Sequence, residues 1–263
     1  MILLSFDTEE FDVPLEHQVN FPFEDQMRVS VYGTTKILDC LKRNDCKATF
    51  FCTVNFAEHA PQIMRRIIDE GHEVASHGYH HWYFEPGDLA KSRVKLQQLT
   101  GCDIRGYRMA RMMPVSEQEV REAGYDYNSS LNPTFIPGRY MNLSVPRTYF
   151  VQDGVLQIPA SVTPWLRFPL FWLAYHNLPA GLYRRLSNHT LHHDGYFVTY
   201  FHPWEFYPLG QHPELKMPFI IRNHAGEGME KRLNDFLNYF KGKDIPFVTF
   251  SEFTDLINKN HTK

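Results

Sequence analysis

The sequence predicts an α/β fold in which parallel strands form a distorted (β/α) barrel of about seven strands. Short apolar runs alternate with helix patterns along most of the 263 residues, at the spacing of βα units. Several of these runs end in residues able to carry chemistry, which is typical of the C-terminal ends of barrel strands. No repeat, low-complexity tract or Gly/Ser linker divides the chain, so we expect a single domain over residues 1–263.

Seven apolar runs have the length and composition of buried strands. The first is Ile-Leu-Leu-Ser-Phe near the start of the chain, and polar or helical segments separate many of the later ones. In chain order they cover residues 2–6, 48–54, 72–77, 104–109, 156–161, 195–201 and 246–250.

Helices are predicted between many of these strands. One begins at Pro61, a favourable first-turn residue, and ends at Gly71. Another is marked by a capping box, in which Ser116 precedes Glu119 by three positions. Helical periodicity also covers residues 34–43, 88–100 and 227–241. The segment 132–186 fits the alternation poorly, and we expect it to be an elaboration of loops and irregular helix.

Composition excludes several classes of protein. A hydrophobic fraction of 43% and a charged fraction of 22% are ordinary for a globular domain. The net charge of -3 gives no reason to expect a nucleic-acid partner. The apolar stretch 163–186 is interrupted by Arg167, His176 and prolines, so we expect no transmembrane segment.

The cellular location is predicted from the N-terminus and the cysteines. The first strand runs directly into acidic residues and does not resemble a secretory leader. The four cysteines form no CxxC pair and are too few for a disulfide scaffold. We therefore expect reduced structural thiols and a cytoplasmic protein.

Four carboxylates follow the first strand within the stretch SFDTEEFD. Asp7 and Glu9 are two residues apart on an extended segment, so their side chains point the same way. One of them could bind a metal while the other accepts a proton from water. Glu10 points away from this pair, and we expect Glu10 and Asp12 to be solvated loop carboxylates.

Histidines are concentrated in the stretch HEVASHGYHH, which holds four of the chain's 14. His77 and His81 are four residues apart and would share one face if the loop turns helically. Neutral imidazoles are preferred ligands of zinc and similar divalent metals. A surface loop that happens to be rich in histidine is the alternative that these residues leave open.

The predicted strands bring further chemistry to the same face of the barrel. Asp7 follows the first strand, His77 ends the third, Arg108 lies near the end of the fourth and His202 follows the sixth. Because the C-terminal ends of parallel barrel strands converge, these four residues are expected to lie together.

Five motifs, in this order, resemble those of polysaccharide deacetylases, the NodB-homology family of carbohydrate esterases. They are SFDTEEFD, SHGYHH, GYRMARMMP, YDYNSSLNP and TYFHPWEF, and with TFSEF near residue 250 the resemblance covers nearly the whole chain. It is closest to a branch associated with exopolysaccharide biosynthesis. The resemblance implies a NodB-like deacetylase barrel acting on an acetylated sugar or glycan.

The resemblance also implies roles for individual residues. Asp7 would be the catalytic base, Arg108 the residue that orients it, and His202 the general acid. His77 and His81 would hold a divalent metal, most readily Zn²⁺, with Co²⁺, Ni²⁺ or Mn²⁺ as alternatives. The expected reaction is removal of an N-acetyl or O-acetyl group from a sugar.

Two departures from the family pattern affect these roles. Familiar members have two adjacent aspartates in the first motif, whereas Thr8 stands in the second position here. We therefore expect Glu9 to replace that metal ligand. In the third motif, familiar members carry an apolar or proline-containing run directly after the arginine, whereas here Pro114 comes only after residues 109–113. Arg111, within that run, adds a positive charge either near the site or facing solvent.

Aromatic residues beside these motifs are candidates for sugar binding. Trp204 follows His202 by two positions, Tyr79 lies between the two histidines and Trp82 directly follows His81, so we expect these three to bind substrate. Farther along the chain, Trp165, Phe171 and Trp172 could form a membrane-facing or glycan-facing patch, although a buried helix is the expected structure.

Three other functions compete with the deacetylase. An amidohydrolase of the same fold could act on a non-sugar amide, because the motifs report mechanism and not substrate. A degenerate barrel could bind glycans without turnover if the altered first motif fails to hold metal. Two histidines and a carboxylate could also form an iron(II) oxygenase site, but His202 has no role in that chemistry.

Overall fold

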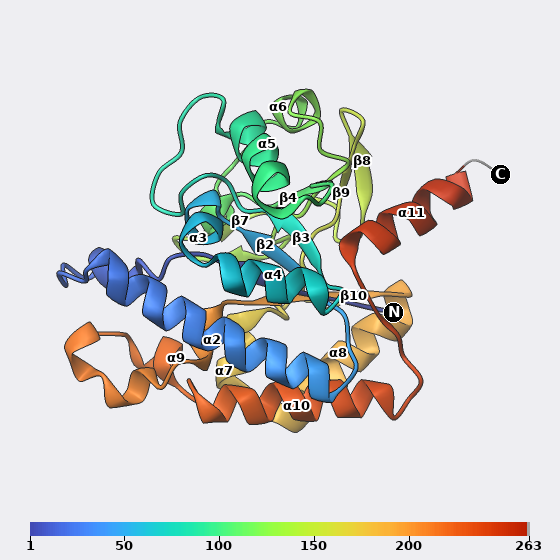
Figure 1. Cartoon of the computed structure of the whole chain (residues 1–263). Helices are drawn as coiled ribbons and strands as arrows, with labels where there is room; N and C mark the ends of the chain where they lie inside the picture. The colour runs from blue at the N-terminus through green and yellow to red at the C-terminus, as the bar shows by residue number, and fades with distance from the viewer. Residues whose placement is uncertain (262–263) are drawn as a thin grey trace.

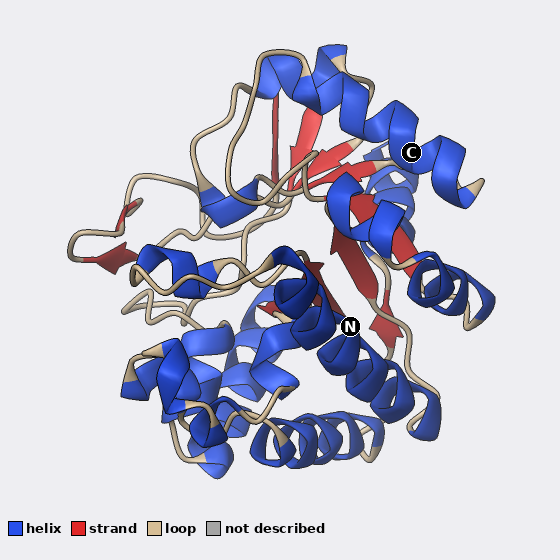
Figure 2. Cartoon of the chain, turned by 60° about the vertical axis from the view of Figure 1, so that its left-hand side comes forward, coloured by secondary structure: helices blue, strands red, loops and turns tan. Residues whose placement is uncertain are grey.

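The computed structural model describes residues 1–261 and has a curved sheet at its centre with helices outside it (Figures 1 and 2). Seven strands form a continuous parallel path, in the order β10-β1-β2-β3-β4-β5-β9. They are β1 (Ile2–Thr8), β2 (Thr49–Cys52), β3 (Glu73–Ser76), β4 (Gly106–Tyr107), β5 (Tyr127–Asn128), β9 (Val155–Gln157) and β10 (Phe197–Phe201). The predicted α/β barrel with about seven parallel strands is confirmed.

The sheet curls into a half-barrel with two additional strands. β8 (Phe150–Gln152) pairs antiparallel with β9, and β11 (Phe247–Val248) pairs with the start of β1. Between β9 and β10 the chain itself bridges the gap, since Ser161 N–H donates to Val198 O at 3.0 Å and Ser161 Oγ accepts from Val198 N–H at 2.9 Å.

Side chains of β1 alternate between two hydrophobic clusters. Ile2, Leu4 and Phe6 belong to the large cluster beneath the outer helices. Leu3 belongs to a smaller cluster inside the barrel, which residues of α11 (Phe250–His261) cover from below. Because the side-chain period of a strand is two, Ser5 and Asp7 follow Leu3 upward along the inner face.

The predicted helices are present, and all but α2 (Phe23–Arg43) have only small shifts at their ends. Ser116 caps its helix by accepting from Glu119 N–H at 3.3 Å. The helices of the barrel lie outside the sheet, as Figure 2 shows. They are α2 (Phe23–Arg43), α3 (Val54–His59), α4 (Pro61–Asp69), α5 (Asp88–Thr100), α6 (Glu117–Glu122), α8 (Ala180–Asp194) and α10 (Glu227–Lys241).

Helix α2 begins 11 residues before the predicted start at residue 34. Its first half buries Gln26, Ser30 and Gly33, so hydrophobic periodicity is weak there. Gly33 lies directly against the backbone carbonyl of Pro203, where an added Cβ would be 1.8 Å from the oxygen. A glycine at this position allows α2 to pack closely on the segment after β10.

The segment 132–186 contains short elements that the sequence did not resolve. β6 (Phe135–Ile136) and β7 (Tyr140–Met141) form a hairpin, and α7 (Trp172–Asn177) precedes α8. Phe171 and Trp172 are buried, but Trp165 is 81% exposed, so the expectation of a buried helix is wrong for Trp165.

The remaining elements are short and mostly surround the upper end of the barrel. They are α1 (Val13–Glu16), α9 (Phe219–Arg222) and the 3₁₀ turns η1 (Ala110–Met112), η2 (Pro203–Phe206), η3 (Leu209–Gln211) and η4 (Pro213–Leu215). Among residues 1–261, no helix is long and apolar enough to cross a membrane.

Candidate active site

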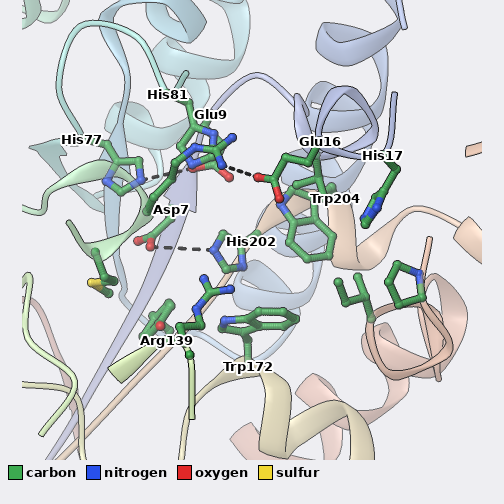
Figure 3. Close-up of a pocket in the computed structure, with 17 residues that line it drawn as sticks. Asp7, Glu9, Glu16, His17, His77, His81, Arg139, Trp172, His202 and Trp204 are labelled. Carbon is green, nitrogen blue, oxygen red and sulfur yellow. Dashed lines mark hydrogen bonds and ion pairs between the residues drawn. The ribbon is translucent and has the colours of Figure 1, made fainter. Parts of the chain in front are cut away.

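A pocket of about 400 Å³ opens at the C-terminal ends of the parallel strands (Figure 3). It gathers Asp7, His77 and His202, the inward-facing residues at or just beyond the ends of β1, β3 and β10. Arg108 lies beneath them and contacts Asp7. Convergence of these four residues agrees with the sequence prediction.

Glu9, His77 and His81 form the only cluster of potential metal ligands found within residues 1–261. Glu9 Oε2 lies 3.1 Å from Nε2 of each histidine. All three side chains are buried, and Glu9 Oε2 has no hydrogen-bond donor. Figure 3 shows the three side chains pointing toward one another.

The hydrogen bonds behind the two histidines favour metal ligation. His77 Nδ1 lies 2.8 Å from the carbonyl oxygen of Arg108, and His81 Nδ1 lies 2.8 Å from Asp12 Oδ1. Both oxygens are acceptors, so Nδ1 carries the proton in each ring. In a neutral imidazole, Nε2 then has a free lone pair directed at Glu9, and two imidazoles with one carboxylate suit Zn²⁺.

The charge of the cluster also suits a cation. Burial disfavours the charged form of His81, but Glu9 and Asp12 outweigh it and raise the pKa of His81 to about 9. The two carboxylates therefore require a positive charge among them, which a divalent ion would supply. The residues present fit the metal that the sequence predicts.

Asp7 is held by a fully buried arginine. Arg108 Nη1 donates to Asp7 Oδ1 at 2.5 Å and to Ser5 Oγ at 2.9 Å, while its Nη2 donates to Ser129 Oγ at 2.9 Å. Burial raises the pKa of Asp7, but the charges of Arg108 and the facing histidines outweigh it and lower that pKa below its ordinary value. Asp7 is therefore an ionised carboxylate with a fixed direction.

His202 faces Asp7 from the other side of the pocket. Its Nε2 lies 4.0 Å from Asp7 Oδ2, and its Nδ1 lies 2.8 Å from Glu205 Oε1. Burial lowers the pKa of His202, but the hydrogen bond to Glu205 and nearby carboxylates outweigh it and raise that pKa. Trp204 stacks on the ring at 4.9 Å and Trp172 meets it edge-on at 5.4 Å.

The three predicted sugar-binding residues lie in different places. Trp204 lines the pocket but is 3% exposed, so little of it can meet a ligand. Trp82 is 50% exposed and packs under the guanidinium of Arg111, which lines the pocket. Tyr79 lies outside the pocket lining and contacts His80.

Two expectations about the acidic stretch are wrong. Asp12 is buried, and besides His81 it pairs with Arg111 at 3.2 Å. Glu10 is also buried, and it accepts from Thr53 Oγ1 at 2.9 Å and from the backbone N–H of His81 at 3.1 Å. Neither carboxylate is solvated, because both tie the histidine loop to the end of β1.

Of the two positions predicted for Arg111, the one near the site is correct, because Arg111 lines the pocket.

Several other residues of the pocket wall were not predicted from the sequence. They come from α1, the β6–β7 turn, α7 and the region of α9, and no motif marked them. They include Glu16, His17, Arg139, Trp172, Pro218 and Ile221.

Comparison with known proteins shows similarity to one family. Residues 14–127 match the family model described as polysaccharide deacetylase, and this range includes His77, His81 and Arg108. Over this range the chain is similar to the polysaccharide deacetylase family. Figure 3 shows His77 and His81, which lie within the matched range, beside Glu9, which precedes it.

Individual relatives match over shorter stretches. Peptidoglycan-N-acetylmuramic acid deacetylase PdaA of Bacillus subtilis is 44% identical over 48 residues, which are 18% of each chain. Peptidoglycan-N-acetylglucosamine deacetylase PgdA of Listeria monocytogenes is 38% identical over 113 residues, which are 41% of this chain and 24% of the relative. The matches therefore span less than a quarter of these curated relatives.

The fold is similar over a much longer range. A crystal structure described as a putative polysaccharide deacetylase from Mycobacterium smegmatis matches with a TM-score of 0.69 and 19% identity. The match covers 99% of this chain and 90% of that protein. At this identity the similarity supports the barrel fold and does not extend to the substrate.

Proposed function

We propose that this protein is a metal-dependent hydrolase that removes N-acetyl or O-acetyl groups from a sugar or glycan. The observation that carries the proposal is the convergence of Glu9, His77 and His81 beside the facing pair Asp7 and His202. A metal ligand set, a buried ionised carboxylate and a protonatable imidazole in one pocket are the groups that acyl hydrolysis requires.

Glu9, His77 and His81 would hold the divalent ion, most readily Zn²⁺, with Co²⁺, Ni²⁺ or Mn²⁺ as alternatives. When bound, such an ion supplies Lewis acidity toward a carbonyl oxygen and toward water. Asp12 keeps the His81 ring in the tautomer whose Nε2 faces the site.

Asp7 serves as the general base. Arg108 holds its Oδ1, so Oδ2 is the oxygen left to face His202 across the pocket. Its lowered pKa keeps the carboxylate ionised, and it takes the proton of the attacking water.

His202 serves as the general acid. Its Nδ1 is occupied by Glu205, so Nε2 is the nitrogen that faces Asp7 and the pocket. A raised pKa keeps His202 protonated until the amine or alkoxide departs, when Nε2 donates its proton to the leaving group.

The substrate is an acetylated sugar held by the aromatic and cationic wall of the pocket. Trp172, Tyr200 and Arg139 contribute to this wall beside His202. The relatives named above act, by their names, on N-acetylated sugars of peptidoglycan, and this supports an N-acetyl group as the first choice.

An acetate-release assay tests the proposal. Protein stripped with a chelator is assayed on N-acetylated and O-acetylated sugars after each metal is restored. We expect metal-dependent acetate release that falls by about 10² to 10⁴ in Asp7→Asn and His202→Ala, while glycan binding persists.

Three results would contradict this function. Full activity in both variants would exclude the base and acid roles. Metal-dependent release from a non-sugar amide alone would identify an amidohydrolase of another substrate class. Glycan binding without turnover under any metal would identify a degenerate binder.

A further inference from the structure

A chain of buried polar groups extends from His202 away from the pocket, and beyond Glu205 it has no role in the proposed mechanism. Glu205 Oε1 accepts from the His202 backbone N–H at 2.6 Å and lies 2.8 Å from its Nδ1. Glu205 Oε2 lies 2.8 Å from Nε2 of His176, whose Nδ1 lies 2.5 Å from the carbonyl oxygen of Asn223. Glu205 and His176 have no exposed surface.

The partners of His176 determine how many protons this chain holds. The carbonyl oxygen of Asn223 can only accept, so Nδ1 of His176 must carry a hydrogen. Hydrogen-bond contact between Nε2 and Glu205 Oε2 requires a second hydrogen between those two atoms. The His176–Glu205 pair therefore holds one proton more than a neutral imidazole and a carboxylate would.

The position of that proton follows from the charges around the pair. Burial raises the pKa of Glu205, but hydrogen bonds and charges from His176 and His202 outweigh it and lower that pKa. Glu205 is then the carboxylate and His176 the imidazolium, and together they have no net charge. A pair of this kind avoids the large cost of an unpaired buried carboxylate.

Helices outside the barrel hold His176 in place. Its backbone oxygen accepts from Asn223 Nδ2 at 3.2 Å and lies 2.8 Å from Nδ1 of His224. Arg232 donates to the carbonyl oxygens of Tyr175 and Leu178 on either side of it. Among residues 1–261, Glu205 is the only carboxylate in contact with the His176 ring.

We propose that His176 is a positioning residue that donates a hydrogen bond from its protonated ring to Glu205. Through Glu205 it orients the His202 ring and limits how tightly His202 holds its own proton. This inference rests on the proposed role of His202 as the general acid. The imidazolium of His176 balances the charge of Glu205, so His202 is not exposed to that charge in full.

Other groups facing His202 are unchanged by substitutions at His176. Their charges act equally on wild type and variants, so differences between pH profiles isolate the His176–Glu205 pair. By element, these groups are Asp7 from β1, Glu9 just beyond its end, Tyr200 from β10, Trp172 from α7, Trp204 from η2 and Arg139 from the β6–β7 turn.

Two substitutions should move the pH profile in opposite directions. His176→Gln keeps a donor toward Glu205 but removes the positive charge, so His202 holds its proton more tightly. The alkaline limb of kcat/KM for acetate release should move up by about one pH unit. Glu205→Gln removes the carboxylate, so the same limb should move down by at least that amount. His189→Gln, an exposed histidine on α8, is the matched control and should leave the limb in place.

Nitrogen-15 NMR of the histidine rings measures how many ring nitrogens of His176 carry hydrogen, and it does not depend on enzymatic activity. In the zinc-loaded wild-type protein at pH 8, both ring nitrogens of His176 should carry hydrogen. In Glu205→Gln, His176 should be neutral with its hydrogen on Nδ1.

The outcomes separate this inference from the proposed function. A neutral His176 ring in the wild type, or alkaline limbs that do not move apart in the two variants, would overturn the role of His176. A doubly protonated His176 in a protein that releases no acetate from any sugar would support the proton count and contradict the proposed function instead. If His176→Gln fails to fold, the wild-type spectrum alone decides the proton count.

Discussion

Replacing Arg108 should destabilise the protein more than any other single arginine substitution near the barrel. Arg108 is fully buried and makes four hydrogen bonds, to Asp7, to Ser5 and twice to Ser129. Its guanidinium also lies 4.0 Å from the ring centroid of Phe51. In Arg108→Met the new side chain fills similar space but leaves the Asp7 carboxylate buried without its cation.

The magnitude follows from the orphaned charge. Removing one partner of a buried ion pair costs about 3 to 5 kcal/mol, and a whole domain is stable by only about 5 to 15 kcal/mol. We therefore expect Arg108→Met to lower the free energy of unfolding by about 4 kcal/mol. For a chain of this size the corresponding fall in Tm is roughly 8 to 16 °C.

Urea denaturation with a double-mutant cycle measures this term. The cycle comprises Arg108→Met, Asp7→Asn and the double variant, all in chelator so that metal binding does not add to stability. Because Asp7→Asn removes the orphaned charge, the double variant should be more stable than the sum of the single effects by at least about 2 kcal/mol.

Arg105 provides the matched control. It pairs with two carboxylates, Asp126 and Asp255, but these are about half exposed. We expect Arg105→Met to cost about 1 kcal/mol or less, because water screens the pairs. If Arg108→Met costs no more than Arg105→Met, or if the cycle shows no coupling, the buried-pair reasoning is refuted.

Three further predictions concern the metal site and the packing behind it. Asp12→Asn should weaken zinc affinity by about 10- to 100-fold, measured in competition with a chromophoric chelator, whereas Glu16→Gln should leave the affinity unchanged. Equal zinc affinities in the two variants would exclude Asp12 as the residue that orients the metal ligand His81. Purified Glu9→Gln should contain less than one zinc ion per chain by elemental analysis, and one retained zinc per chain would show that Glu9 is not a ligand. Gly33→Ala should lower the free energy of unfolding by about 1 to 3 kcal/mol and also reduce activity, because the close approach of α2 to η2 leaves no room for a methyl group. The control Gly181→Ala on α8 has open space around it and should be neutral or stabilising, so similar losses in both would contradict the packing argument.

The core of the site could be predicted from the sequence because local rules place it. The period of two along a strand puts Asp7 and Glu9 on the same side. The rule that working residues lie at the C-terminal ends of parallel strands brings His77, Arg108 and His202 together. Both rules depend only on where each strand ends, which apolar runs indicate well.

The supporting residues could not be predicted, because long-range packing decides their burial. The sequence predicts a solvated loop carboxylate at Asp12, yet the chain folds back so that Asp12 contacts His81, 69 positions away. His176 meets Glu205 across 29 positions through a segment without clean periodicity. Helix α8 was missed for a related reason, since its buried face includes Ser187 and Thr190 alongside apolar residues.

The geometry of β1 explains why the altered first motif still forms a ligand set. Leu3 packs in the barrel interior, Ser5 contacts Arg108, and Asp7 is held by the same arginine above it. Glu9 continues this inward row and reaches the two histidines at the top of the barrel. Thr8 is buried on the opposite side of the strand, where its Oγ1 donates to the backbone oxygen of Phe6.

A carboxylate at position 8 would therefore have to leave this strand direction to reach the histidines, whereas Glu9 reaches them within it. With Thr8 on the outer face, the inward row of Ser5, Asp7 and Glu9 is complete. One row of side chains thus runs from the hydrophobic interior through the buried Arg108–Asp7 pair to the metal ligand Glu9. Substitutions at Arg108 should therefore affect stability and catalysis together. Substitutions at Glu9, at the open end of that row, should remove the metal while leaving the fold largely intact.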